Sequence, residues 1–120
     1  MNDLQTNEGE SQAGLCPVAM IPDGGVHAVM VTLSTGPVSV LLTRLGERVQ
    51  AFHNECPHAG RRLDWAPNRF LMEHGHVICA SHGAAFTLDT GLCVGGPCRG
   101  QSLHPFPVKV VDGWVRLLRD

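Results

Sequence analysis

The chain has 120 residues, of which 43% are hydrophobic, and it carries a formal net charge of −2 at pH 7. This length suits one globular domain, and the hydrophobic fraction is sufficient for a buried core. The near-neutral charge gives no indication of a protein that binds nucleic acid or a membrane surface. Because the sequence contains no long apolar run, no membrane-spanning helix is expected.

The N-terminal residues 1–14 are polar and rich in Gly, Ser and Gln. They cannot bury enough apolar surface to offset the entropy of ordering, so we expect a disordered tail followed by one domain over residues 15–120. The tail lacks the basic and apolar regions of an export signal, which favours a cytoplasmic location. In that reducing compartment, five cysteines indicate a metal site rather than disulfides.

From Leu15 onward, short apolar runs alternate with breaks at Gly, Pro and Asp. This pattern predicts strands over residues 26–33, 38–45, 49–53, 77–79, 86–88, 108–111 and 114–118. The Asp112-Gly113 pair between the last two runs is typical of a hairpin turn. No long segment has a 3.6-residue period, so we predict an all-β fold built from small antiparallel sheets or a sandwich.

Two Cys and two His stand in two pairs, Cys56 with His58 and Cys79 with His82, and twenty residues separate His58 from Cys79. Such pairs of thiolates and imidazoles indicate a metal site. The single residue between Cys56 and His58 is tight for one tetrahedral zinc ion. The spacing suits a two-iron cluster better, because the Cys can then bind one iron and the His the other.

The segments Cys56-Pro57-His58-Ala59-Gly60 and Cys79-Ala80-Ser81-His82-Gly83-Ala84 resemble the two cluster loops of Rieske [2Fe–2S] proteins. The resemblance continues through residues 86–91, the Gly95-Gly96-Pro97 segment and residues 103–108. It implies a Rieske-type fold, with an antiparallel β-sandwich base and a small cluster-binding subdomain at about residues 53–99. The segment between the two loops is a few residues longer than is usual in the family, which predicts a longer hairpin there.

The resemblance implies one [2Fe–2S] cluster with four ligands, which would be Cys56, His58, Cys79 and His82. In this family the iron with histidine ligands lies nearer the surface, so we expect it to hold the transferred electron. With two neutral imidazoles the oxidised centre carries no net charge, so it accepts an electron more readily than a cluster with four Cys ligands.

Within the Rieske range, the sequence predicts a low reduction potential. High-potential members have an extra Cys in each cluster loop, where this chain has Arg61 and Ser81. They also place hydroxyl donors where this chain has Ala84 and Phe86. Because hydrogen bonds to the sulfurs stabilise the reduced cluster, their absence lowers the expected potential to the order of −150 mV.

The resemblance implies a soluble ferredoxin that carries single electrons from a flavin-dependent reductase to a terminal oxygenase and catalyses no reaction itself. We expect these partners to dock near His58 and His82, where Arg61 and Arg62 are either docking contacts or a solvated turn. Two alternatives remain: a Rieske-like small subunit of a larger oxidoreductase such as nitrite reductase, and a zinc-binding interaction module. The identity of the partners, the final substrate and the oligomeric state are not predicted.

Other potentially reactive side chains have simpler interpretations. Cys16, Cys93 and Cys98 are expected to be small buried residues, although Cys93 and Cys98 flank the Gly95-Gly96-Pro97 segment and could pair under oxidation. Glu73, His74 and His76 are expected to be exposed hairpin residues rather than a mononuclear iron site.

Overall fold

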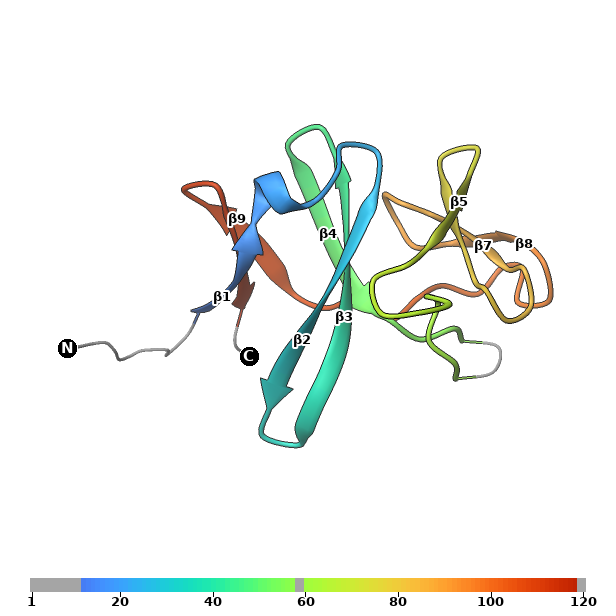
Figure 1. The fold of residues 1–120 in the computed structure, drawn as a ribbon, viewed down its shortest axis with the longest axis horizontal. Coiled ribbons are helices and arrows are strands. Elements are labelled where there is room, and N and C mark those ends of the chain that lie inside the picture. The colour runs from blue at the N-terminus through green and yellow to red at the C-terminus, as the bar shows by residue number, and fades with distance from the viewer. Residues whose placement is uncertain (1–11, 58–59, 119–120) are drawn as a thin grey trace.

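The computed structural model describes residues 12–57 and 60–118 of the chain (Figure 1). The regular secondary structure in that part of the chain consists of β-strands and one short 3-10 helix, η2. The elements in chain order are β1 (Gln12–Pro17), η2 (Val18–Met20), β2 (Val26–Leu33), β3 (Gly36–Leu45), β4 (Arg48–His53), β5 (Leu71–Glu73), β6 (His76–Ile78), β7 (Ala85–Thr87), β8 (Cys93–Gly95), β9 (Val108–Val111) and β10 (Trp114–Leu118). None of the described elements is a helix long and apolar enough to cross a membrane.

The strands form three antiparallel sheets, with strand orders β1-β10-β9, β2-β3-β4 and β5-β6-β7-β8. In Figure 1 the sheet of β2, β3 and β4 stands in the middle, with the β1 and β9 end on one side and the β5–β8 sheet on the other. The all-β prediction, with a sandwich base and a separate small subdomain, is therefore confirmed.

The middle sheet is buried on both faces, which explains why β3 contains a continuous apolar run. Leu41 of β3 pairs with Phe52 of β4, and both belong to the core of the β5–β8 subdomain. Val40 and Leu42, on the opposite face, belong to the core of the base. Because successive side chains of a strand point to opposite faces, a run without alternation serves two cores at once.

Hydrogen bonds join the small subdomain to this sheet. The Thr43 hydroxyl, which is buried, donates to the Leu88 carbonyl oxygen at 2.6 Å. The backbone N–H of His53 at the end of β4 donates to the His104 carbonyl oxygen at 2.8 Å. A buried hydroxyl must find an acceptor, so Thr43 fixes the position of the segment after β7.

The predicted strands are all present, with shifts of one or two residues at some ends. The Asp112-Gly113 hairpin turn is confirmed, since both residues have positive φ angles of 51° and 78°. The structure differs from the prediction at β1, which begins at Gln12, inside the segment predicted to be a disordered tail. Backbone pairing of Gln12 with Leu118 forms this ladder, and such pairing needs no apolar side chain. Residues 1–11 lie outside the described residues.

Candidate metal centre

The first candidate loop follows β4 and is closed by its own backbone. The N–H of Cys56 donates to the Arg61 carbonyl oxygen at 2.7 Å, and the N–H of Gly60 donates to the Cys56 carbonyl oxygen at 2.8 Å. Gly60 has a φ of 68°, a conformation that residues with a Cβ rarely adopt. The loop therefore turns back on itself directly after the cysteine.

The second candidate loop, between β6 and β7, repeats this hydrogen-bond pattern. The N–H of Cys79 donates to the Ala84 carbonyl oxygen at 2.7 Å, and the N–H of Gly83 donates to the Cys79 carbonyl oxygen at 2.9 Å. Gly83 also has a left-handed φ, 76°. In each loop a buried cysteine is followed four residues later by a glycine in the same conformation. The two loops thus present their cysteines in equivalent backbone settings.

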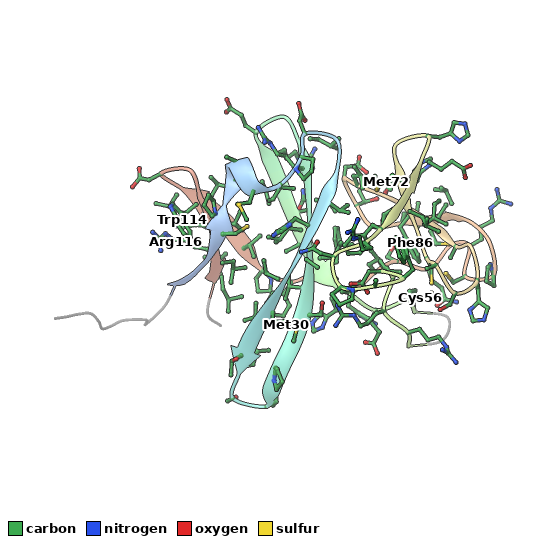
Figure 2. All side chains as sticks on the ribbon, in the orientation of Figure 1. Met30, Cys56, Met72, Phe86, Trp114 and Arg116 are labelled. Atoms are coloured by element: carbon green, nitrogen blue, oxygen red, sulfur yellow. The ribbon has the colours of Figure 1, made fainter. Side chains whose placement is uncertain are left out.

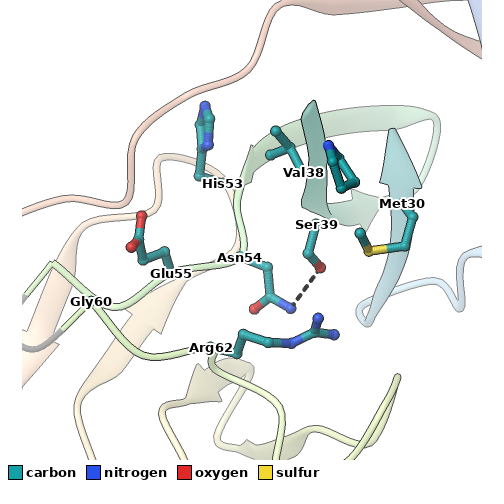
Figure 3. Close-up of a pocket in the computed structure, with 9 residues that line it drawn as sticks. Met30, Val38, Ser39, His53, Asn54, Glu55, Gly60 and Arg62 are labelled. Carbon is teal, nitrogen blue, oxygen red and sulfur yellow. Dashed lines mark hydrogen bonds between the residues drawn. The ribbon is translucent and has the colours of Figure 1, made fainter. Parts of the chain in front are cut away.

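The two loops are also joined to each other and to the middle sheet. The N–H of Ala80 donates to the Leu63 carbonyl oxygen at 3.1 Å, and the N–H of Leu63 donates to the Asn54 side-chain oxygen at 3.0 Å. The Asn54 amide nitrogen donates in turn to the Ser39 hydroxyl of β3 at 3.1 Å (Figure 3). Since Asn54 is buried, its amide links the sheet to the far end of the first loop.

A shallow hollow of about 260 Å³ opens on the side of the first loop that faces the β2–β3 hairpin (Figure 3). It is lined by Met30, Pro37, Val38, Ser39, His53, Asn54, Glu55, Gly60 and Arg62. Neither candidate cysteine lines this hollow, so the candidate metal centre lies elsewhere, inside the core of the small subdomain.

The two candidate cysteines are fully buried and adjacent. Cys56 is 0% exposed and Cys79 is 1% exposed. Burial raises the pKa of the Cys79 thiol, while the backbone N–H groups of His82 and Ser81 donate to its sulfur and oppose that rise. The neighbouring Cys56 thiol raises the pKa of Cys79 further. Two buried cysteines, one with backbone amide donors at its sulfur, form a setting suited to binding metal as thiolates.

Of the two candidate histidines, His82 is exposed, in contrast to the buried Cys79 of the same loop. His58 lies outside the described residues, so the complete set of four candidate ligands is not visible. Among residues 12–57 and 60–118, no three His, Cys, Asp or Glu side chains converge on one possible metal position. Glu73 and His76 pair across the β5–β6 hairpin, as expected. Glu73 and His74 are exposed, as predicted, whereas His76 is half-buried.

The two arginines after the first loop have different environments. Arg62 makes a bidentate ion pair with Asp64, with nitrogen to oxygen distances of 2.9 and 2.8 Å, and the Asp64 side chain is 2% exposed. This pairing holds the pKa of the Asp64 carboxyl below its usual value. Arg61 is exposed and uses its backbone carbonyl to close the first loop. Arg62 is exposed as well, but its guanidinium is fixed by the ion pair with Asp64.

The Gly95-Gly96-Pro97 segment lies directly on the second loop. A Cβ placed on Gly96 would stand 2.8 Å from the Ala84 Cα and 3.2 Å from the Gly83 carbonyl oxygen. Only a residue without a side chain permits this close approach, so the segment covers the second loop. We refer to residues 93–101 as the cover loop.

Two further side chains complete the surroundings of the cysteines. Phe86 is 0% exposed and belongs to the same buried core as Cys56, Cys79 and Cys98. Figure 2 shows Phe86 and Cys56 in the small subdomain, at the opposite end of the molecule from Trp114. Burial and the Cys93 thiol raise the pKa of Cys98 to about 12, and Cys56 contributes to this rise. Cys98 is thus a neighbour of the candidate ligand Cys56 in this core.

A sequence model of the family described as "Rieske [2Fe-2S] domain" matches residues 13–112. The chain belongs to the Rieske [2Fe–2S] family. Its cofactor is accordingly one Rieske-type [2Fe–2S] cluster. The buried sulfur pair, the repeated loop geometry and the exposed His82 fit such a cluster, whose two irons take different ligands. They offer no support for the zinc alternative.

Relatives of this Rieske chain include short and long proteins. It is 32% identical over 103 residues to the 3-phenylpropionate/cinnamic acid dioxygenase ferredoxin subunit of Photorhabdus laumondii subsp. laumondii, covering 86% of this chain and 90% of that protein. It is 31% identical over 99 residues to apoptosis-inducing factor 3 of Homo sapiens, covering 82% of this chain. The chain spans only 15% of the length of that second relative.

Solved structures share the Rieske fold over almost the whole chain. The ferredoxin of Sphingomonas yanoikuyae B1 superposes with a TM-score of 0.72 at 25% identity, over 91% of this chain and 99% of that one. A chain from the complex of reduced oxygenase and oxidized ferredoxin in carbazole 1,9a-dioxygenase has a TM-score of 0.70 at 22% identity. That comparison covers 92% of this chain and 94% of the other, so the two chains share their fold over almost their whole length.

Sequence reasoning missed the residues that support the loops. Asn54 and Asp64 act through hydrogen bonds to partners nine and two residues away, and no motif marks such contacts. The repeated glycine four residues after each cysteine was visible in the sequence and could have predicted the matching loop conformations.

Proposed function

We propose that this protein is a Rieske ferredoxin that carries single electrons from a flavin-dependent reductase to a terminal oxygenase. The observation that carries the proposal is the match to a dioxygenase ferredoxin subunit over nearly the whole of both chains. The extent of the match matters, because it covers 86% of this chain and 90% of that ferredoxin subunit, so it includes nearly all of that protein. Under this proposal the chain itself catalyses no reaction, since it works as a component of a larger oxidoreductase.

The ligands we assign to the cluster are Cys56, His58, Cys79 and His82. The support for this assignment is the equivalent backbone setting of the two cysteines and the burial of both side chains in one core. The bound cluster would supply a centre that takes up and releases one electron at a time.

The residues around the ligands would have two roles: some would exclude water from the sulfurs, and others would be accessible to a partner protein. The buried side keeps water away from the sulfurs, because Cys56, Cys79 and Phe86 are all fully or almost fully buried. The exposed side places His82 at the surface, where a partner protein could approach the cluster edge. Arg61, also exposed, would lie beside that approach and steer partners with acidic surfaces.

A reconstituted electron-transfer chain tests the proposal. Cluster-loaded protein would be mixed anaerobically with a flavin reductase and a terminal oxygenase of an aromatic-ring dioxygenase system, and its visible absorption followed in time. We expect the reductase to reduce one cluster per chain with one electron, and the oxygenase to reoxidise it. Failure of several such reductases and oxygenases to exchange electrons with a properly loaded cluster would contradict the proposed role.

A second candidate function is that of the Rieske component of a larger oxidoreductase. The match to apoptosis-inducing factor 3 favours it, because there the matching region is a small part of a long protein. Stable copurification with one large enzyme subunit would favour this second candidate, and transient exchange with separate partners would favour the ferredoxin.

A further inference from the structure

The cover loop brings two cysteines together that the proposed cluster does not use. The N–H of Cys93 donates to the Gln101 carbonyl oxygen at 2.7 Å, and its carbonyl oxygen accepts from the Gly100 N–H at 3.0 Å. Cys93 therefore sits at the base of the loop, paired with the returning arm. Cys98 lies two residues before Gly100 on that arm, so the two cysteines come from opposite arms.

The sulfur atoms of this pair are in direct contact. The Cys98 Sγ donates to the Cys93 Sγ at 3.3 Å, and the Cys93 Sγ donates to the Gly95 carbonyl oxygen at 3.0 Å. A disulfide bond is about 2.05 Å long, so about 1.3 Å of approach would join the two sulfurs. Rotation of two side chains on a loop that contains two consecutive glycines can supply a movement of that size.

We propose that Cys93 and Cys98 are a site of reversible disulfide formation on the cover loop. The oxidant is a low-molecular-weight disulfide such as glutathione disulfide. One S–S bond breaks in the oxidant and one forms between the Cys93 and Cys98 sulfurs. The two thiol protons end on the two glutathione thiols that leave, so atoms and electrons balance. This inference does not depend on which proteins exchange electrons with the cluster.

The position of the pair gives the bridge a consequence for the metal centre. Gly96 of the same loop presses on the Ala84 backbone in the second candidate loop, and Cys98 neighbours Cys56. A bridge between the two arms would hold the loop in this covering position. We therefore expect protein with the Cys93–Cys98 disulfide to lose its cluster more slowly than protein in which both cysteines are thiols.

Access to the pair requires partial opening of the loop. Cys93 is 1% exposed and Cys98 is 0% exposed, whereas Gly96 and Pro97 between them are exposed. Local opening exposes such groups without global unfolding. The reaction should therefore be slow in the folded protein and complete only on long incubation.

Thiol counting on the cluster-loaded protein tests the proposal. The protein, with its cluster oxidised, would be equilibrated at several ratios of glutathione disulfide to glutathione, acid-quenched, and alkylated after unfolding. All five cysteines are free thiols in the structure. We expect the count to fall from five to three at oxidising ratios, with peptide mapping placing the bridge between Cys93 and Cys98, and to return to five with dithiothreitol.

Two variants provide matched controls. Cys93→Ser cannot form the bridge, so its count of four should fall by one at most, and any thiol lost should carry glutathione as a mixed disulfide on Cys98. Cys16→Ser should fall from four to two, because Cys16 is buried in the separate core of the base. A wild-type count that stays at five, or a bridge that contains Cys56 or Cys79, would overturn the proposal.

The rate of cluster loss provides a second readout. The decay of visible absorption in excess chelator should be slower for bridged wild-type protein than for its thiol form. Pretreatment with the oxidant should leave the decay of Cys93→Ser unchanged. Equal decay of the bridged and thiol forms would show that the bridge does not hold the cover loop in place.

Discussion

Gly96 lies so close to Ala84 that a Cβ at position 96 would stand 2.8 Å from the Ala84 Cα. Real Cβ atoms do not approach a backbone atom this closely, so the cover loop would have to move away from the second candidate loop. Gly96 also has a φ of 92°, which a residue with a side chain rarely adopts. Any side chain at position 96 would therefore displace the cover loop from the candidate metal centre.

We predict that Gly96→Ala accelerates loss of the cluster, because it lifts the cover from the second loop and admits water. The measurement is the decay of visible absorption in excess chelator. Gly95→Ala is the matched control, since a Cβ there would meet the Ala85 Cβ at an ordinary 3.9 Å. Equal decay rates for the two variants would contradict this account of the cover loop.

The features predicted correctly from the sequence are those determined by residues close together in the chain. The Asp112-Gly113 turn needs two residues that tolerate positive φ, and the sequence places such residues between two apolar runs. The Rieske loops carry their Cys, His and Gly residues in short motifs. The burial of β3 on both faces was not predicted, although the run Val40-Leu41-Leu42 lacks the alternation of a strand with one exposed face.

The features that the sequence did not predict depend on distant partners. Strand β1 exists because Gln12 and the residues after it pair with β10, at the other end of the chain. The three-residue strands β5 and β8 are too short to show a period. The ion pair of Arg62 with the buried carboxylate of Asp64, two residues away, was also not predicted, because no motif marks it.

The ion pair between Arg62 and Asp64 should stabilise the fold only while Asp64 is ionised. The pKa of Asp64 is lowered in the folded protein, so its contribution is present above the unfolded value, near pH 4, and is lost as the pH falls through the folded value. We predict that Asp64→Asn lowers stability at pH 7 by about 1 kcal/mol, a modest value because Arg62 is half-exposed.

The measurement for Asp64 is the urea concentration at which the loaded protein loses its visible absorption, at pH 7 and in mild acid. The difference between wild type and Asp64→Asn should shrink on acidification. Asp89→Asn, at an exposed position, should match the wild type at both pH values. A difference that grows in acid would contradict the sign of this argument.

Arg61 is the better test of docking, because Arg62→Glu would place a second carboxylate against Asp64 and disturb the loop. We predict that Arg61→Glu slows association with the oxygenase or reductase several-fold at low salt and that the effect fades at high salt. Arg48→Glu makes the same charge change at the start of β4, away from the first loop. Stopped-flow mixing at several ionic strengths gives the rates, and equal slowing by both variants would rule out a specific docking role.

The reduction potential should lie near the low end of the Rieske range, on the order of −150 mV. The residues at the two donor positions, Ala84 and Phe86, are buried and have no side-chain hydrogen-bond donor. We predict that Phe86→Tyr raises the potential by about 20–60 mV, the equivalent of one hydrogen bond for a one-electron couple. Voltammetry of both proteins measures this, and a wild-type midpoint well above zero would contradict the tuning argument.

The central claim is that one [2Fe–2S] cluster is held by Cys56, His58, Cys79 and His82. Pulsed electron paramagnetic resonance of the dithionite-reduced protein tests it most directly, because the spectrum reports the nitrogen nuclei bound to the cluster. We predict a rhombic signal with two strongly coupled histidine nitrogens in the wild type, and one in any His82→Cys protein that retains a cluster. A reduced cluster without coupled histidine nitrogens, or stoichiometric zinc in freshly prepared anaerobic protein, would contradict the claim.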